Sequence, residues 1–270
     1  MGVINTNVNS LITQNALKVN NRAMASAMEQ LATGKRINSS KDDAAGLAVS
    51  ENMTAQIRGL NMAVRNANDG ISLAQTAEGA MIEISNMLQR MRELAVQAST
   101  GTISNTQRSH LNVEFGQLAT QINNTIANTT WNGMSVLSSA DMTFAIQVGM
   151  NSGQTVTITS AALSSVDFSA GSISTSASAA AALSSLDTGL NSVNNSRASL
   201  GAVISRLTSA GDNLTNISQN ISESRSRILD TDYAKATTEL ARTQIISQAG
   251  TAVLAQANAL PQTVLKLLQG

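Results

Sequence analysis

A heptad repeat over the C-terminal half of the chain is the feature that most constrains its fold. A leucine, valine or isoleucine recurs at every seventh position over six full heptads, at Leu186, Val193, Leu200, Leu207, Leu214, Ile221 and Ile228. This period places the side chains along one side of an α-helix, which is typical of helices that pack along each other. We predict a long helix that ends near Asp230, where RILDTDYAK interrupts the pattern.

The N-terminal half carries a second long helical pattern. Ser40 and Asp43 match a capping box, and Asp42 and Asp43 favour a helix N-terminus. From about residue 41 to 98 the predicted helix is roughly 85 Å long. Its seam comprises Ile57, Leu60, Val64, Ala67, Ile71 and Ala74 and then, after one phase slip, Ala77, Met81, Ile84, Leu88, Met91, Ala95 and Ala98. Gly101 ends this helix, and a third helix is predicted over 105–128.

Between the helical halves the pattern changes at about residues 141–178. Phe144, Ile146 and Val148 alternate with small or polar residues, as do Val156 and Ile158, and the turn-rich stretch 149–154 separates the two runs. This alternation predicts a β-hairpin. The low-complexity stretch VDFSAGSISTSASAAA follows and is predicted to be a Ser/Ala-rich loop.

Both ends of the chain are predicted to be amphipathic helices. The first, over 5–33, carries Leu17, Asn21, Met24, Met28 and Leu31, and the last carries Ile246, Gly250, Val253, Ala257, Leu260, Val264 and Leu267. Two long helices that are joined through a tip pack antiparallel, so the terminal helices meet at one end and can pair. Because their seams are rich in Ala, Gly and Asn, such a pair buries little area. We therefore expect the terminal helices to complete their burial against other copies of the chain. The alternative is that the heptads form only an intramolecular bundle core.

Composition supports a mainly α fold, a long antiparallel helical rod with a small β-hairpin tip. Aromatic residues make up 2% of the 270 residues and proline occurs once, which favours uninterrupted helices over a compact globular core. The 17 basic and 17 acidic residues balance, so no charge excess points to nucleic acid or an anionic membrane. Without cysteine and with His110 as the only histidine, we expect no metal, no cofactor and no catalytic site.

Four motifs resemble bacterial flagellin: MGVINTNVNSLITQNAL, LATGKRINSSKDDAAGLAVSE, MLQRMRELAVQAS and QAGTAVLAQANALPQTVLKLL. They cover roughly residues 1–140 and 180–268 in the family's order. The resemblance implies a structural subunit that self-assembles into the extracellular flagellar filament used for motility. It also implies an inner coiled-coil domain formed by 1–40 with 231–270, a rod domain over 41–230, and no outer domains.

The resemblance further implies partners and the residues that meet them. Assembly residues would be Leu17, Met24, Met28, Leu31, Ile246, Val253, Leu260, Val264 and Leu267. The epitope of a host innate-immune surface receptor would comprise Gln89, Arg90, Glu93, Leu94 and Glu114. Leu265, Leu267 and Leu268 would contact a cytosolic receptor, although this chain ends LKLLQG where the family typically ends near LLR. The hook–filament junction proteins, the filament cap and a flagellar export chaperone are the remaining expected partners. Secretion through the type III flagellar apparatus fits an N-terminus that lacks a Sec-type signal pattern.

Two alternative functions remain at this point. A hook–filament junction protein shares the logic of the terminal helices, but its relatives usually diverge from the VLAQANALPQ and LAVQAS motifs present here. A signalling coiled coil would need a membrane span or a sensor domain, and the sequence shows neither pattern. An enzyme is the weakest interpretation, because no set of nucleophile, base and orienting residue is visible.

Overall fold

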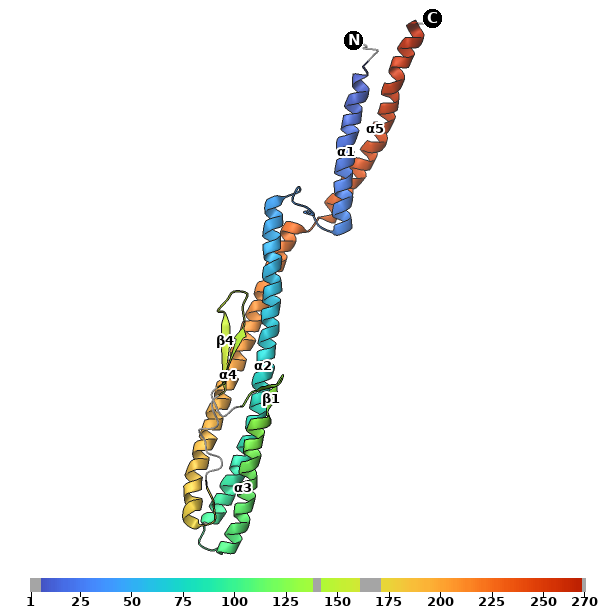
Figure 1. Cartoon of the computed structure of the whole chain (residues 1–270). Helices are drawn as coiled ribbons and strands as arrows, with labels where there is room; N and C mark the ends of the chain where they lie inside the picture. The colour runs from blue at the N-terminus through green and yellow to red at the C-terminus, as the bar shows by residue number, and fades with distance from the viewer. Residues whose placement is uncertain (1–5, 138–141, 161–170, 269–270) are drawn as a thin grey trace. The chain divides into compact units, whose positions relative to one another are not determined.

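A computed structural model describes residues 6–137, 142–160 and 171–268, with backbone alone at 142, 160 and 260–268 (Figure 1). The elements are α1 (Val8–Thr33), α2 (Ala44–Ser99), α3 (Asn105–Asn128), β1 (Thr130–Trp131), β2 (Met134–Ser135), β3 (Met142–Gln147), β4 (Thr155–Ser160), α4 (Ser176–Leu229) and α5 (Tyr233–Leu268). The mainly helical fold with a β-hairpin is therefore confirmed. The chain forms two compact units, one of Met1–Ala55 with Asn220–Gly270 and one of Gln56–Gln219.

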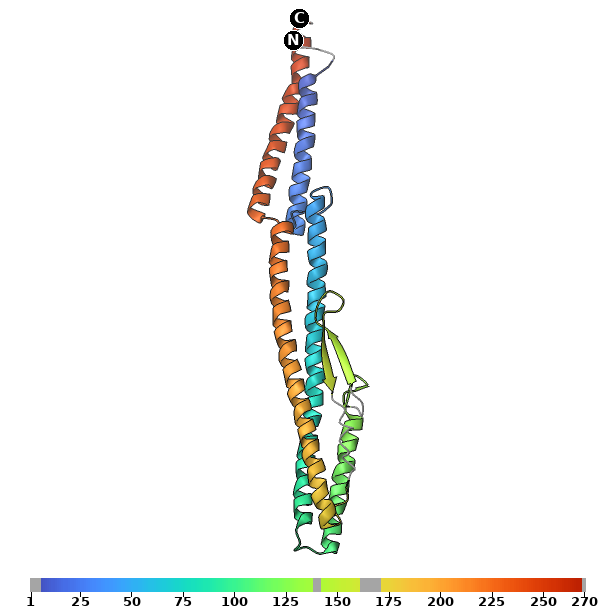
Figure 2. The same ribbon diagram turned by 90° about the vertical axis from the view of Figure 1, so that its left-hand side faces the viewer.

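The core of the second unit lies between α2, α3 and α4, and the β3–β4 hairpin lies beside α2 (Figure 2). The heptad residues of α4 from Leu186 to Leu214 are buried there, as predicted. Phe115 and Ile122 of α3 are also buried. These large apolar side chains supply most of the hydrophobic stabilisation, because few aromatic residues are available to do so.

The phase slip predicted in α2 was wrong, because the buried seam runs without interruption. It comprises Leu60, Ala63, Ala67, Gly70, Ala74, Ala77, Met81, Ile84, Leu88, Met91, Ala95 and Ala98. Ile57, Val64 and Ile71 lie only half-buried beside it. The reason is close packing: a Cβ atom at Gly70 would lie 3.0 Å from Ile146 Cγ1 and 3.2 Å from Leu207 Cδ1. A side chain at Gly70 would be crowded, and a search for large apolar residues passes over the small seam residues Ala63 and Gly70.

The capping box predicted between Ser40 and Asp43 was also wrong in its detail. Helix α2 begins at Ala44, and Asp43 Oδ1 accepts a hydrogen bond from the Gly46 N–H at 2.9 Å. The preceding residues fold around the carboxylate of Asp42, which accepts hydrogen bonds from Ser39 Oγ and from the N–H groups of Ser39 and Asn38. These hydrogen bonds, that from Ser39 Oγ foremost, hold the pKa of Asp42 below its usual value.

The predicted hairpin is confirmed, and the loop after it is shorter than predicted. Strands β3 and β4 pair antiparallel with Phe144 opposite Ile158 and Ile146 opposite Val156. Residues 161–170 of the predicted loop lie outside the described residues. Helix α4 already begins at Ser176, because the alanine-rich run favours helix and buries Ala179 and Ala182.

One buried arginine caps the end of α2. The Arg108 guanidinium donates to the carbonyl oxygens of Ala98 at 2.8 Å and Thr100 at 2.7 Å, and to Asn105 Oδ1 at 2.9 Å. Ser176 Oγ donates to the carbonyl oxygen of Ser99, which lies between them. Side chains from α3 and α4 thus satisfy the carbonyl groups that a helix leaves unpaired at its C-terminus.

Candidate assembly interface

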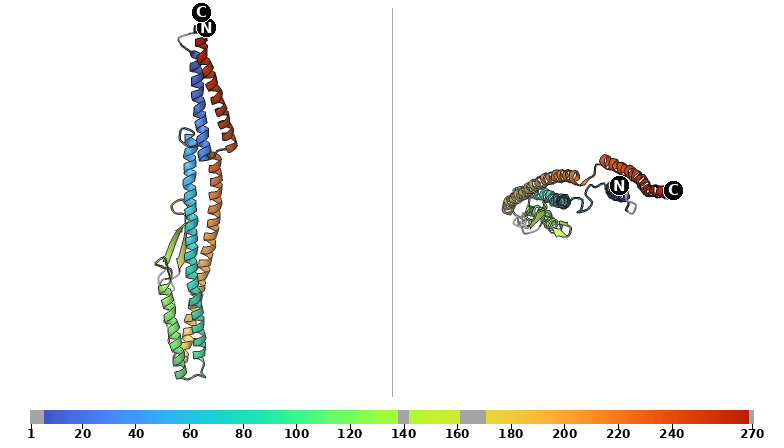
Figure 3. Two further views of the ribbon diagram at one scale, coloured as in Figure 1. Left: turned by 90° about the vertical axis from the view of Figure 1, so that its right-hand side faces the viewer. Right: turned by 90° about the horizontal axis from the view of Figure 1, so that it is seen from above.

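Helices α1 and α5 lie side by side and form the main contact of the first unit (Figure 3). Two connecting segments hold the pair together at its base. The Arg36 N–H donates to the Leu229 carbonyl oxygen at 2.7 Å, and the Thr231 N–H donates to the Gly34 carbonyl oxygen at 3.0 Å. Gly34 ends α1 with a positive φ of 70°, because glycine adopts this conformation without strain.

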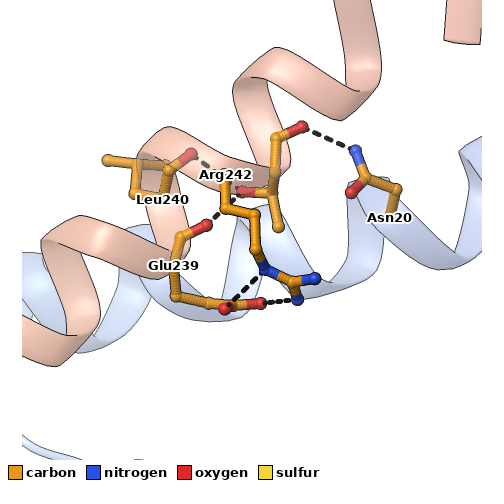
Figure 4. A network of polar contacts seen from close by, with 5 residues as sticks. Asn20, Glu239, Leu240 and Arg242 are labelled. Carbon is orange, nitrogen blue, oxygen red and sulfur yellow. Dashed lines mark hydrogen bonds and ion pairs between the residues drawn. The ribbon is translucent and has the colours of Figure 1, made fainter. Parts of the chain in front are cut away.

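The seam between α1 and α5 consists mainly of small and polar residues. Asn20 and Thr243 are buried in it, and Asn20 Nδ2 donates to the Thr243 carbonyl oxygen at 2.7 Å (Figure 4). A second amide, Asn7 Nδ2, donates to the Ala257 carbonyl oxygen at 2.7 Å. Hydrogen bonds from asparagine to backbone across two helices fix the register of the pair but bury little apolar area.

Gly250 is the point of closest packing in this seam. A Cβ atom at Gly250 would lie 2.7 Å from Leu17 Cδ2, so the side chain of Leu17 occupies the space above the glycine. Leu17 is half-buried as a result. The predicted pairing of the two terminal helices is therefore present, and Leu17 and Gly250 meet in it.

A polar pair flanks the seam on α5. Arg242 donates to Glu239 through Nη2 at 2.6 Å and through Nε at 3.0 Å (Figure 4). These hydrogen bonds hold the pKa of Glu239 below its usual value and raise that of Arg242. Because both side chains are exposed, the pair adds little to stability in water.

Several large apolar residues of both helices are exposed, although Leu17, Met24 and Leu31 are half-buried. We call the exposed ones the outer apolar residues: Val8, Leu11, Ile12, Val19 and Met28 on α1, and Ile245, Ile246 and Val253 on α5. Between 41% and 65% of each residue's surface is exposed. In α1, Val8, Ile12 and Val19 follow helical spacing along one exposed stripe, about a quarter turn around the helix from Asn20 and Ala27. The pair therefore carries a second apolar surface that it cannot bury by itself.

The predicted assembly residues divide accordingly. Leu17, Met24 and Leu31 are half-buried, whereas Met28, Ile246 and Val253 are exposed. The side chains of Leu260, Val264, Leu265, Leu267 and Leu268 lie outside the described residues. The predicted stripes included Leu17 and Gly250 but not the buried seam residues Asn20 and Thr243, because these two are polar.

The residues of the predicted receptor epitope are brought together only in part. Arg90 of α2 pairs with Glu93 at 2.9 Å and with Glu114 of α3 at 2.9 Å, and Gln89 lies exposed beside them. The hydrogen bond that Arg90 donates to Glu93, followed by the one that it donates to Glu114, raises the pKa of Arg90. Leu94, in contrast, is 1% exposed and belongs to the core. Sequence reasoning missed a further exposed ion pair, Arg92 with Asp187 of α4 at 2.7 Å.

Neither a metal centre nor a membrane span is found in the part of the chain that the structure describes. No three His, Cys, Asp or Glu residues in 6–137, 142–160 or 171–268 gather closely enough to hold an ion. No helix in these ranges is both long and apolar enough to cross a bilayer.

Comparison with known proteins agrees with this helical architecture. The family model of the bacterial flagellin N-terminal helical region matches residues 4–141, and that of the C-terminal helical region matches 183–268. A flagellin of Halalkalibacterium halodurans is 44% identical over 274 residues, covering 99% of this chain and 100% of that protein. A flagellin of Escherichia coli O127:H6 is 53% identical over 156 residues, covering 58% of this chain and 28% of that protein.

A solved structure gives the same result. The crystal structure of Bacillus cereus flagellin aligns with a TM-score of 0.52 at 32% identity, covering 56% of this chain and 88% of that one. Full-length similarity to a flagellin does not favour the junction-protein or signalling alternatives. The chain belongs to the bacterial flagellin family and is a structural subunit that polymerises with copies of itself into the flagellar filament.

Proposed function

We propose that the α1–α5 pair is the element through which this subunit enters the filament wall, and that the outer apolar residues are its contact surface. The observation that carries the proposal is the inversion of the pair, with polar and small residues inside and large apolar residues outside. Exposed apolar residues at helical spacing on both helices of a pair are typical of an unfilled interface. Copies of the same chain are the natural occupant, since the family self-polymerises.

The proposal assigns roles to the parts of the chain. Residues 1–40 with 231–270 form the inner coiled-coil domain, and residues 41–230 form the rod. Ile246, Val253 and Met28 contact neighbouring subunits directly, while Leu17, Met24 and Leu31 support them from the edge of the seam. Leu260, Val264 and Leu267 extend the same contact surface. The assembled filament is extracellular, and the subunit performs no catalysis.

Seeded polymerisation tests the proposal. Purified chain is dissociated by heat, seeded with filament fragments under salting-out conditions, and examined by negative-stain electron microscopy beside a chain that lacks residues 231–270. We expect long uniform filaments from the full chain and none from the truncated chain, which should stay dispersed with its second unit folded. Filaments from the truncated chain would refute a role for α5 in assembly.

We also propose that the exposed cluster of Gln89, Arg90, Glu93 and Glu114 is recognised by a host innate-immune surface receptor. The cluster is joined by the Arg90–Glu93 ion pair within α2 and the Arg90–Glu114 ion pair between α2 and α3, which favours its recognition as a preformed surface. Buried Leu94 would contribute by supporting the helix from below. Replacing Arg90 with alanine should weaken activation of receptor-bearing reporter cells, whereas Arg227→Ala, which breaks another exposed pair, should not. Equal activation by both variants would contradict this role.

The remaining partners follow from the same family membership. Leu265, Leu267 and Leu268 would contact a cytosolic receptor. An export chaperone would cover the outer apolar residues of α5 before assembly, and the junction and cap proteins would meet the subunit at the two ends of the filament. Co-purification of the full chain, but not of the chain lacking 231–270, with the chaperone would test the chaperone contact.

A further inference from the structure

Among the described residues, no strand pairs with the outer edge of β4, and we call this edge open. The Val148 N–H donates to the Gln154 carbonyl oxygen at 2.9 Å. Ile146 lies opposite Val156 and Phe144 opposite Ile158 in the same register. Because hydrogen-bonded positions recur at every second residue, Val156 and Ile158 form the hydrogen-bonded pairs with β3. In an antiparallel pair these alternate with residues whose N–H and C=O groups point away from the partner strand. Thr157 and Thr159 therefore direct their backbone groups away from β3.

The two edges of the hairpin differ. On the β3 side, Asn66 Nδ2 of α2 donates to the Gln147 carbonyl oxygen at 3.1 Å, and that edge meets a helix. The described sheet ends at β4, because β3 and β4 form a two-stranded sheet. Neither proline nor lysine lies in Thr155–Ser160, although natural proteins commonly use these residues to protect an edge.

A groove lies between this edge and α4. It is lined by Thr159 of β4 and by one face of α4 between Thr188 and Ser199, and every lining side chain is a serine, threonine or asparagine. Asn191 and Asn195 are exposed along it. An extended polypeptide backbone needs hydrogen-bond donors and acceptors on both of its sides. The groove offers uncharged hydroxyl and amide groups on the α4 wall and the outward N–H and C=O groups of β4 on the other wall.

One buried hydroxyl in the groove wall has no partner. Ser196 is 5% exposed and lines the groove, yet its Oγ makes no hydrogen bond within the described part of the chain. A buried hydroxyl without a partner costs free energy that an added donor or acceptor recovers. The unpaired group therefore points to a ligand that reaches into the groove.

We propose that an extended segment of a neighbouring copy of this chain pairs with the open edge of β4 and lies in the groove against α4. The inference rests on the self-assembly of the subunit. The second copy is the partner that the observations favour, because the groove carries no charge to select a charged partner and assembly brings copies together at high local concentration. Strand addition would give a contact in the second unit that is independent of α1 and α5.

Hydrogen exchange of the full chain, as monomer and as filament, tests the inference. The Thr157 and Thr159 amides should exchange fast in the monomer and slow by about tenfold or more in the filament. The Val156 and Ile158 amides, which bond to β3, should be protected in both states and serve as internal controls. Fast exchange of Thr157 and Thr159 in intact filaments would overturn the inference but leave filament assembly standing. Slow exchange already in the monomer would also overturn it, because the chain would then cover its own edge.

A pair of variants gives a second measurement. Thr159→Pro removes the outward N–H without removing a bond to β3, and Thr159→Val keeps that N–H as the matched control. We expect the critical concentration for seeded assembly to rise about fivefold for Thr159→Pro and to stay near that of the unmodified chain for Thr159→Val. Equal values for both variants would refute strand pairing, and absence of filaments from the unmodified chain would refute the proposed function itself.

Discussion

Replacing Ile246 and Val253 together with alanine should raise the critical concentration of assembly without unfolding the subunit. Ile246 is 41% exposed and Val253 is 56% exposed, so these fractions remain to be buried when copies meet. Alanine removes three carbons from isoleucine and two from valine, each worth about 0.8 kcal/mol on full burial. Scaled by the exposed fractions, each substitution costs about 1 kcal/mol of assembly free energy, and the two together about 2 kcal/mol.

This loss corresponds to a critical concentration about 30-fold higher. The measurement is the monomer concentration that remains after seeded assembly and sedimentation, for the double variant and the unmodified chain at equal salt. Alanine is the stronger helix former, so the helical circular dichroism of the monomer should not fall.

The matched control is Gln248→Ala with Gln256→Ala, which replaces two exposed polar residues of α5 and should change the critical concentration by less than about threefold. If the double apolar variant also stays within about threefold, Ile246 and Val253 are not buried in the filament. The reasoning from the inverted pair would then be wrong.

Three further predictions concern the folded subunit. Arg108→Ala should lower the free energy of unfolding of the second unit by about 3 kcal/mol, because three hydrogen bonds of a buried cation are lost. The thermal midpoint of this unit should fall by about 6–12 °C. An unchanged midpoint would contradict the capping role of Arg108. Gly34→Ala should destabilise the first unit by about 1–2 kcal/mol because φ is +70°, whereas Gly79→Ala, in a helix with open space around the added Cβ, should be neutral or stabilising in the same denaturant titration. The carboxylate of Asp42 has a pKa below 3.8, so its stabilising hydrogen bonds are fully present above that pH and are lost as the pH falls through the lower folded value. Ser39→Ala should raise this pKa, and an unchanged carboxyl titration by NMR would show that the Ser39 hydroxyl is not the cause.

The long helices and the hairpin could be predicted from the sequence because their signals are local and repeated. Leu186, Val193 and Leu200 repeat at a fixed period, and Phe144 and Ile146 alternate over a short stretch, so the pattern itself states which face is buried. A small second hairpin, β1–β2, was missed although Asn132 and Gly133 carry the turn signal. Both have positive φ, the conformation that a two-residue hairpin turn requires.

The candidate site was predicted only in outline. The two terminal helices and their pairing follow from spacing, and Arg90, Glu93 and Glu114 were named from the motif. The buried polar residues of the seam could not be predicted: Asn20 and Thr243 lie inside it, and Asn20 Nδ2 donates to the Thr243 carbonyl oxygen. A hydrophobic pattern ranks such residues as surface, since burial of a polar group is favourable only when its partner is in place.

The sequence by itself determined the helical class, the family motifs and the apolar residues that must be buried somewhere. Only the tertiary structure decided where they are buried. It placed Ala63 and Gly70 in the core of α2 and left Ile246 and Val253 outside the α1–α5 pair. The physical reason is that the distance between packed backbones limits the size of the side chains between them. Where two helices, or a helix and the hairpin, approach closely, small residues occupy the seam. Large apolar residues are then left for a neighbouring copy to bury.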